Sequence, residues 1–143
     1  LAEHVSFVTQ DNFLFRCSIL ENIRLGNPEA SDEEVKAAAR AAQCEEFILK
    51  LPQGYDTPCT DDIFSQGEWQ LLSIARAAAA DPAVLLLDEI TANLDAETEA
   101  RVLEALDRAS KGRTVLSISH RVYKSLGGRT IRIDASKEAE NAC

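Results

Sequence analysis

The sequence predicts an α/β fold in which a parallel β-sheet carries a helical insertion. Two observations lead to this prediction. After residue 65, apolar runs typical of strands alternate with helical patterns, and this alternation indicates βαβ units with a parallel sheet. Residues 13–64 show only helical and loop patterns, so we expect them to form a helical insertion behind a first strand.

The first half of the chain predicts one strand followed by helices. Residues 5–8 are apolar and β-prone, and polar residues end this run. Ser31 and Glu34 have the spacing of a capping box, in which a hydroxyl and a carboxylate each accept a backbone N–H at a helix start. The elements expected in this half are a strand over residues 5–8, helices over 18–23, 31–42 and 45–51, and a loop over 55–64.

The second half predicts the rest of the sheet. Ser65 and Glu68 have the spacing of a second capping box, which opens the longest helix, to about residue 80. Residues 83–87 are apolar without alternation, as is typical of a parallel strand that is buried on both faces. The remaining expected elements are a helix over 96–109 with Asp95 as its N-cap, a strand over 114–118, a short helix over 122–126 and an edge strand over 130–133.

Composition bounds the classes of function. The chain has 143 residues, 45% of them hydrophobic, which suits one globular domain with its own core. Its net charge of −9 argues against nucleic acid as a partner, because surfaces that bind nucleic acids are basic. No window of about 18 apolar residues occurs, and the first residues do not resemble a signal peptide. A chain that begins at Leu1 and contains no methionine is expected to be a piece of a longer protein.

The cysteines predict free thiols rather than a metal centre. They are Cys17, Cys44, Cys59 and Cys143. No pair has the C-x-x-C spacing of a zinc or redox site, and the two histidines do not supply the missing ligands. We therefore expect reduced cysteines, as in a cytosolic protein.

Polar side chains with catalytic potential follow three of the expected strands. They are Gln10, Asp88, Glu89 and His120. Because the strands of a parallel sheet end at one edge, we expect these side chains to converge there, although each taken alone is also consistent with the start of a solvated loop. One carboxylate can hold hydrated Mg²⁺, a second can deprotonate an attacking water, and an imidazole can stabilise a phosphoryl oxygen that gains charge. The set predicts metal-assisted hydrolysis of a phosphoanhydride.

The order of the motifs resembles that of the ATP-binding domain of ABC transporters. Residues Val84-Leu85-Leu86-Leu87-Asp88-Glu89 resemble a Walker B element, and Phe64-Ser65-Gln66-Gly67-Glu68 resemble the signature motif of the family. The other similar segments are a Q-loop at 8–10, a D-loop at 92–95, a switch-histidine loop at 119–121 and two exporter-like stretches at 14–23 and 51–57. The resemblance covers about residues 5–134, with the motifs in the family's order.

The resemblance implies a role for each residue at the sheet edge. Asp88 would orient Mg²⁺ through water, and Glu89 would be the general base of ATP hydrolysis. Gln10 would contact the metal and the attacking water, and His120 would contact the γ-phosphate of ATP.

The resemblance also implies a site that is shared between two domains. Ser65 and Gly67 would bind the γ-phosphate of a nucleotide held by a second ATP-binding domain, in a homodimer or a heterodimer. The free N–H groups at a helix start give this contact a physical basis. Asp95 would lie at the dimer interface. Ser65 and Asp95 can also act simply as helix N-caps, and this role is compatible with the phosphate contact and with the interface position.

The fold implied by the family is a partial P-loop NTPase (RecA-like) parallel sheet with an inserted α-helical subdomain. Residues 1–12 would supply the first strand and the Q-loop, 13–76 the helical subdomain ending in the signature helix, and 77–143 the ATPase core. The implied function is the coupling of ATP binding and hydrolysis to transport, with a transmembrane domain as partner, at the cytoplasmic face of the cell membrane.

The chain departs from the family pattern in two places. The signature has Phe64, Gln66 and Glu68 where the family usually has Leu, Gly and Gln. Glu68 would bring a negative charge near an anionic ligand unless it folds back onto the N–H of Ser65. No G-x-x-x-x-G-K-[ST] phosphate loop occurs, so ATP hydrolase activity is expected of the intact parent and not of this fragment alone.

Two other functions stay open at this point. One is a soluble ABC-type ATPase of DNA repair or translation, against which the exporter-like stretches argue. The other is a regulatory module that does not hydrolyse ATP, against which Glu89 and His120 argue.

Overall fold

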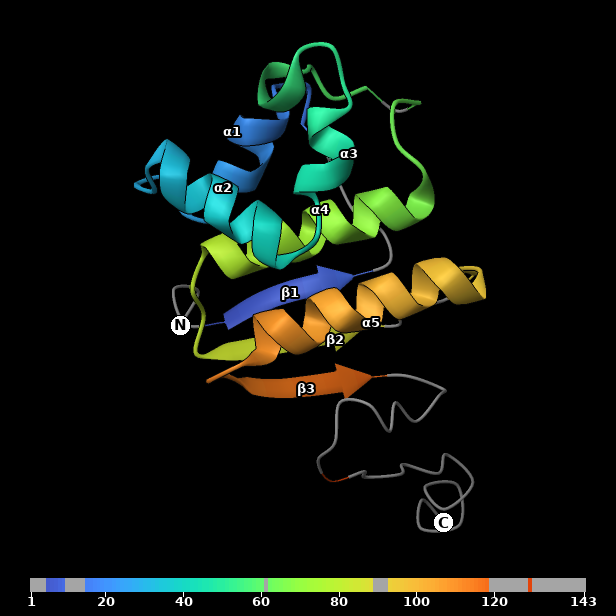
Figure 1. Ribbon diagram of the computed structural model, residues 1–143. Helices are drawn as coiled ribbons and strands as arrows, with labels where there is room; N and C mark the ends of the chain where they lie inside the picture. Colours follow the sequence, from blue (N-terminus) through green and yellow to red (C-terminus); the bar gives the residue numbers. More distant parts are fainter. Residues whose placement is uncertain (1–4, 10–14, 61, 89–92, 119–128, 130–143) are drawn as a thin grey trace, which may run out of the picture.

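The computed structural model describes residues 5–9, 15–60, 62–88, 93–118 and 129 (Figure 1). The strands are β1 (Val5–Thr9), β2 (Val84–Asp88) and β3 (Thr114–Ile118). The helices are α1 (Ile19–Arg24), α2 (Asp32–Ala41), α3 (Glu45–Leu49), α4 (Gln66–Ala79) and α5 (Ala96–Ser110), with a single 3-10 turn, η1 (Gly54–Asp56). The expected helix over 122–126 and strand over 130–133 lie outside the described residues.

The three described strands form a parallel sheet in the order β1-β2-β3. Thr9 pairs with Asp88, and Asp88 pairs with Ile118, so the strands end at the same level. Helices α1 to α4 lie between β1 and β2 in the chain, and α5 lies between β2 and β3. The predicted α/β class with a parallel sheet is confirmed.

Helices cover one face of the sheet in the part of the chain that the structure describes. Val8, Leu85 and Leu87 are at most 1% exposed and share one core with side chains of α4 and α5. On the opposite face, Phe7 is 67% and Leu116 is 57% exposed. The prediction that the run at 83–87 is buried on both faces is wrong here, because β2 alternates between buried and half-buried side chains. An apolar run indicates two apolar faces, but not that both are covered.

Helix α4 connects the sheet with the other helices. It contacts α1, α2 and α5 and also β1. Its side chain Ile74 is fully buried and shares one core with side chains of α1 and α2. Edge-to-face contacts between Phe47 and Phe64 (5.7 Å between ring centroids) and between Phe64 and Trp69 (6.1 Å) pack α3 against the start of α4. Helices α1, α2 and α4 therefore share one core, and α3 packs against the start of α4.

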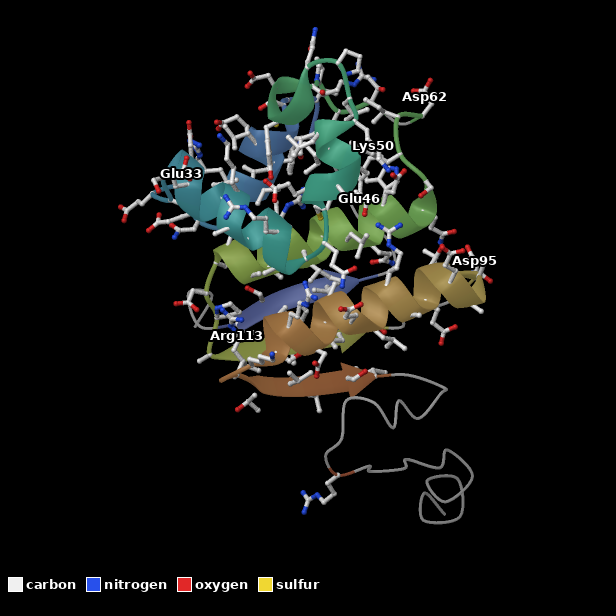
Figure 2. The ribbon with its side chains drawn as sticks, viewed as in Figure 1. Glu33, Glu46, Lys50, Asp62, Asp95 and Arg113 are labelled. Atoms are coloured by element: carbon white, nitrogen blue, oxygen red, sulfur yellow. The ribbon has the colours of Figure 1, made fainter. Side chains whose placement is uncertain are left out.

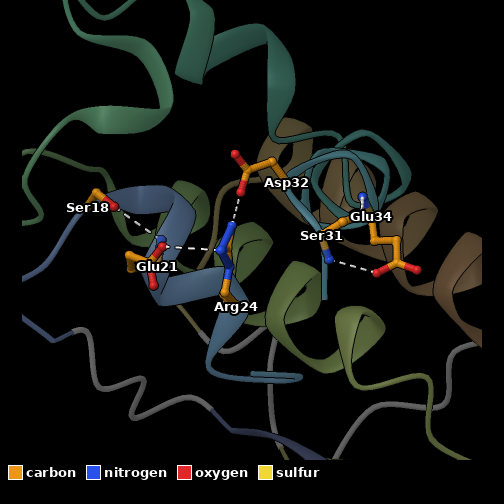
Figure 3. Close-up of polar contacts among 6 residues, drawn as sticks. All are labelled: Ser18, Glu21, Arg24, Ser31, Asp32 and Glu34. Atoms are coloured by element: carbon orange, nitrogen blue, oxygen red, sulfur yellow. Dashed lines mark hydrogen bonds and ion pairs between the residues drawn. The ribbon is translucent and has the colours of Figure 1, made fainter. Parts of the chain in front are cut away.

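The capping box at the start of α2 is confirmed. The Ser31 N–H donates to the Glu34 carboxylate at 2.8 Å, and the Glu34 N–H donates to the Ser31 hydroxyl at 3.3 Å (Figure 3). Figure 3 also shows the Arg24 guanidinium between Asp32 and Glu21, with which it forms ion pairs. These ion pairs tie the end of α1 to the start of α2.

Several shorter features differ from expectation. Helix α1 begins at Ile19 because Ser18 is its N-cap, and α3 ends at Leu49 rather than at 51. The expected loop at 55–64 contains most of η1 and an isolated antiparallel bridge between Ser18 and Pro58. One turn of 3-10 helix has too few residues for a periodic pattern, so the sequence does not distinguish it from a loop.

Arg113 fixes the two turns that precede β2 and β3. Its Nη2 lies 2.7 Å from the Asp81 carboxylate, and its Nε donates to the Pro82 carbonyl at 3.0 Å. These contacts hold together the starts of two neighbouring strands. Within the described residues, no helix combines the length and the apolar character that a membrane span requires.

Candidate nucleotide site

The register of the sheet aligns the points at which the candidate catalytic segments begin. Thr9, Asp88 and Ile118 lie side by side at the carboxyl ends of the strands. Neighbouring strands lie about 5 Å apart, so the three segments leave the sheet within roughly 10 Å of one another. The predicted residues that follow these ends, and that lie outside the described residues, are Gln10, Glu89 and His120. Their convergence therefore stays a prediction.

Asp88 is the described member of this set. It is the last residue of β2, and its side chain is exposed. Because side chains alternate along a strand, Asp88 shares with Leu86 the face that α4 and α5 leave uncovered. No group of three or more His, Cys, Asp or Glu side chains suited to a metal occurs in the described ranges. One exposed carboxylate fits Mg²⁺, which keeps several waters and takes its remaining ligands from phosphates.

The first turn of α4 contains the predicted signature residues. The Ser65 N–H donates to the Glu68 carboxylate at 2.9 Å, and the Glu68 N–H donates to the Ser65 hydroxyl at 3.2 Å. The second predicted capping box is thus confirmed, and Glu68 folds back onto the helix cap. The N–H groups of Gln66 and Gly67 have no partner inside the helix, as in any first turn. Such N–H groups and the helix dipole favour an anion at this end.

Asp95 begins α5 as its predicted N-cap. Its Oδ1 accepts the Thr98 N–H at 2.9 Å, and its Oδ2 accepts the Thr98 hydroxyl at 2.7 Å. These two hydrogen bonds hold the pKa of Asp95 below its usual range, because they stabilise the carboxylate. Figure 2 shows Asp95 at the end of α5 that lies next to the start of α4.

The starts of α4 and α5 lie on the side of the sheet towards which the strands run (Figure 1). Both helices return antiparallel to the strands, so their N-termini and the strand carboxyl ends share one side. Gly67 in the first turn of α4 is buried against Thr98 in the first turn of α5. Thr98 is not among the residues that the sequence analysis selected. Its position three residues after the aspartate N-cap could have indicated it, because the N–H at this position donates to the capping side chain.

Comparison with known sequences agrees with these motifs. The sequence model of the ABC transporter family matches residues 1–92. The chain is 52% identical over 124 residues to an uncharacterized ABC transporter ATP-binding protein of Bacillus subtilis. These residues are 85% of this chain and 20% of that protein. It is 51% identical over 133 residues to the mitochondrial potassium channel ATP-binding subunit of Homo sapiens. These residues are 92% of this chain and 18% of that protein.

A third relative carries the name of a multidrug export ATP-binding/permease protein, from Staphylococcus aureus. It is 48% identical over 124 residues, which are 85% of this chain and 22% of that protein. The matched region is thus an α/β ATP-binding domain with a parallel sheet. The chain belongs to the ABC transporter family. It spans about a fifth of the length of these relatives. The names of the Bacillus subtilis and Staphylococcus aureus relatives favour a transporter over repair, translation or a regulatory module.

Proposed function

We propose that these residues belong to the ATP-binding domain of an exporter, whose complete protein couples ATP binding and hydrolysis to transport across a membrane. The alignment of Asp88 with the strand ends that precede Gln10 and His120 carries this proposal. Ser65 and Gln66, which are exposed at the start of α4 on the same side of the sheet, support it. The names of the relatives support ATP as the substrate.

The chain's own nucleotide would be held at the strand edge. Mg²⁺, when bound, supplies positive charge beside the triphosphate. Asp88 would help to hold this ion, and Gln10 would contact the ion and the attacking water. Glu89 accepts a proton from that water, and His120 donates a hydrogen bond to a γ-phosphate oxygen. These residues form only part of a nucleotide site, the part that acts on the γ-phosphate, because the chain contains no phosphate loop.

The first turn of α4 would serve the nucleotide of a second ATP-binding domain, in a homodimer or a heterodimer. The Ser65 hydroxyl and the N–H groups of Gln66 and Gly67 are hydrogen-bonding groups that suit a phosphate oxygen. Glu68 is already engaged with the Ser65 N–H, so its carboxylate is held in the cap. Asp95 would lie at the interface of the two domains.

The proposed organisation follows the family. Residues 1–12 and 77–143 form parts of the RecA-like ATPase core, and residues 13–76 form an inserted helical subdomain that ends in the signature helix. The partners are a transmembrane domain and the second ATP-binding domain, at the cytoplasmic face of the membrane. Nucleic acid is not a partner on this proposal, because the net charge of the chain is −9.

The substitution Ser65→Ala tests the phosphate contact, and Ser31→Ala is its matched control. Both serines cap a helix through the same pair of hydrogen bonds to a glutamate three residues on. Each substitution removes a cap that stabilises by about 1 kcal/mol. In the complete protein we expect Ser65→Ala to lower the kcat of ATP hydrolysis by about tenfold or more. Ser31→Ala should leave it within about twofold of wild type, since its helix start is far from the strand edge.

Equal kcat values for Ser65→Ala and Ser31→Ala would reject the phosphate contact and leave Ser65 as a helix cap only. Melting temperatures of the two variants provide the check that both caps were lost to a similar degree.

A further inference from the structure

The first turns of α4 and α5 meet at a point that has no room for a side chain. A Cβ atom added to Gly67 would overlap the Cγ2 methyl of Thr98, and it would lie 3.5 Å from the Thr98 Cβ and 3.7 Å from its Oγ1. The backbone of Gly67 is helical, so its conformation does not require glycine. Glycine is a poor helix former. The close approach of Thr98 therefore explains this glycine.

Asp95 fixes the side chain whose methyl group fills this space. One oxygen of its carboxylate accepts the Thr98 N–H at 2.9 Å, and the other accepts the Thr98 hydroxyl at 2.7 Å. Threonine is branched at Cβ, so holding the hydroxyl also fixes the direction of the methyl group. That direction is towards Gly67. A chain of direct contacts thus runs from Asp95 through Thr98 to the first turn of α4.

We infer that Thr98 is a positioning residue that couples the loop ending at Asp95 to the phosphate-binding first turn of α4. This inference rests on the proposed function. On that proposal, Asp88 and Glu89 at the other end of the loop act on this chain's own nucleotide, whereas Ser65 contacts the nucleotide of the second domain. The contact between Thr98 and Gly67 then links the two nucleotide sites within one chain.

The packing makes this link stiff. A side chain at position 67 would hold the two helices apart, but at Gly67 the methyl of Thr98 lies directly against the helix backbone. Closely packed groups transmit a displacement rather than absorb it. A shift of Asp95 therefore moves the methyl of Thr98, and with it the N–H groups of the first turn of α4.

Two substitutions of Thr98 break the link at different places. Thr98→Val keeps a methyl group against Gly67 but removes the hydroxyl that Asp95 holds. Thr98→Ser keeps that hydroxyl but removes the methyl group. In the complete protein we expect each to lower the kcat of ATP hydrolysis about fivefold or more, with KM for ATP within about twofold of wild type. A residue that only stabilises the fold would lower the melting temperature and leave kcat of the folded protein unchanged.

A double variant moves the methyl group across the contact. Gly67→Ala alone places a Cβ on the Thr98 methyl and should lower kcat at least as far as either substitution of Thr98. Gly67→Ala combined with Thr98→Ser puts the methyl on α4 and keeps the hydroxyl bond to Asp95. We expect this double variant to recover kcat to within about threefold of wild type, which is non-additive behaviour expected only of residues in contact.

The outcomes separate this inference from the proposed function. If Ser65→Ala lowers kcat while Thr98→Val and Thr98→Ser stay within about twofold of wild type, the coupling through Thr98 is overturned and the phosphate contact stands. A double variant no more active than the slower single variant also overturns the coupling. If Ser65→Ala matches Ser31→Ala, the proposed function itself fails at this site.

Discussion

Arg76 of α4 binds Asn22 of α1 at two points: its Nε donates to the Asn22 carbonyl at 3.1 Å, and its Nη2 donates to Asn22 Oδ1 at 3.3 Å. The buried Asn22 amide donates in turn to the carbonyls of Phe15, Cys17 and Ser18. Its Oδ1 also accepts the Phe15 N–H at 2.9 Å. Asn22 therefore shapes the segment that leads into α1, and Arg76 ties this segment to α4.

We expect Asn22→Ala to destabilise the chain by about 2–4 kcal/mol, because it removes the side-chain hydrogen bonds that join Asn22 to residues 15–18 and to Arg76. Asn27→Ala is the control: the Asn27 side chain accepts one exposed hydrogen bond, from the Glu29 N–H at 3.2 Å, and the loss of this bond should cost less than about 1 kcal/mol. Urea unfolding followed by the fluorescence of Trp69, the only tryptophan, measures both. Equal midpoints for the two variants would show that the buried network contributes nothing specific.

Local signals in the sequence predict the helix starts well, and they do not predict how many layers cover the sheet. Ser31, Ser65 and Asp95 cap the helices that they were expected to cap, since a cap depends on residues within one turn. Leu86 was expected to be buried, but what covers a strand face comes from distant parts of a chain. In the described residues α4 and α5 cover the other face only.

In the candidate site, too, the sequence predicts the residues that local signals define and does not predict contacts between distant residues. Asp88, Ser65 and Asp95 lie where strand ends and caps predicted them, because each is defined by the element that it terminates or begins. The role of Gly67 was assigned to phosphate binding alone. Its contact with Thr98 joins residues 31 positions apart in sequence, and no local pattern reports such a distance between helices.

Glu89→Gln in the complete protein should abolish steady-state ATP turnover and retain ATP binding. The amide keeps the shape of the side chain but cannot accept the proton of the attacking water. Glu104→Gln is a control, because Glu104 is exposed on α5 and pairs with Arg108 at 2.9 Å. Turnover and binding of radiolabelled ATP are measured on the same preparations. Turnover of Glu89→Gln within about threefold of wild type would remove Glu89 from the role of general base.

The cysteines should differ sharply in their reaction with iodoacetamide. Burial raises the pKa of Cys59 to about 11, and it raises the pKa of Cys44 further, because a thiolate is poorly solvated inside the protein. Both stay protonated at pH 8, whereas Cys17 is only half-buried. Among the cysteines that the structure describes, we expect mass spectrometry to find Cys17 alkylated before Cys44 and Cys59. Alkylation of Cys59 at the rate of Cys17 at pH 8 would contradict the burial.

The same shift gives a dependence of stability on pH. The pKa of Cys59 is raised from 9.0 to about 11 on folding, so folding favours its protonated form. This contribution is fully present below pH 9 and is lost as the pH rises from 9 towards 11. The unfolding midpoint should therefore fall over that range, and it should fall less in Cys59→Ala. Parallel pH profiles for the two proteins would show that Cys59 does not titrate differently on folding.

The sheet face that the described helices leave uncovered should make the isolated chain self-associate. Phe7, Leu86 and Leu116 form one row across the three strands, and Phe7 and Leu116 are mostly exposed. The family resemblance implies a further strand beside β3, the strand that leads into the phosphate loop. The chain contains no phosphate loop, so we expect this edge of β3 to be open for pairing with another chain. We expect light scattering to detect dimers or larger species. Leu116→Lys should reduce them, whereas Leu49→Lys, which changes an equally exposed leucine on α3, should not. A monomer at high concentration would count against this prediction.

The isolated chain should bind Mg-ATP weakly and should not hydrolyse it. A phosphate loop provides several backbone N–H groups and a lysine to the β- and γ-phosphates, and none occurs here. Hydrogen bonds to charged groups contribute roughly 1.5–3 kcal/mol each, so losing about four removes on the order of 6–12 kcal/mol. Micromolar affinity corresponds to only about 8 kcal/mol in total. Asp88 and Glu89 repel a polyphosphate unless Mg²⁺ lies between them, and the net charge of −9 adds no attraction. Titration calorimetry tests this, with the complete protein as the positive control. A dissociation constant below about 10 µM, or turnover that Glu89→Gln removes, would place the nucleotide on groups other than a phosphate loop.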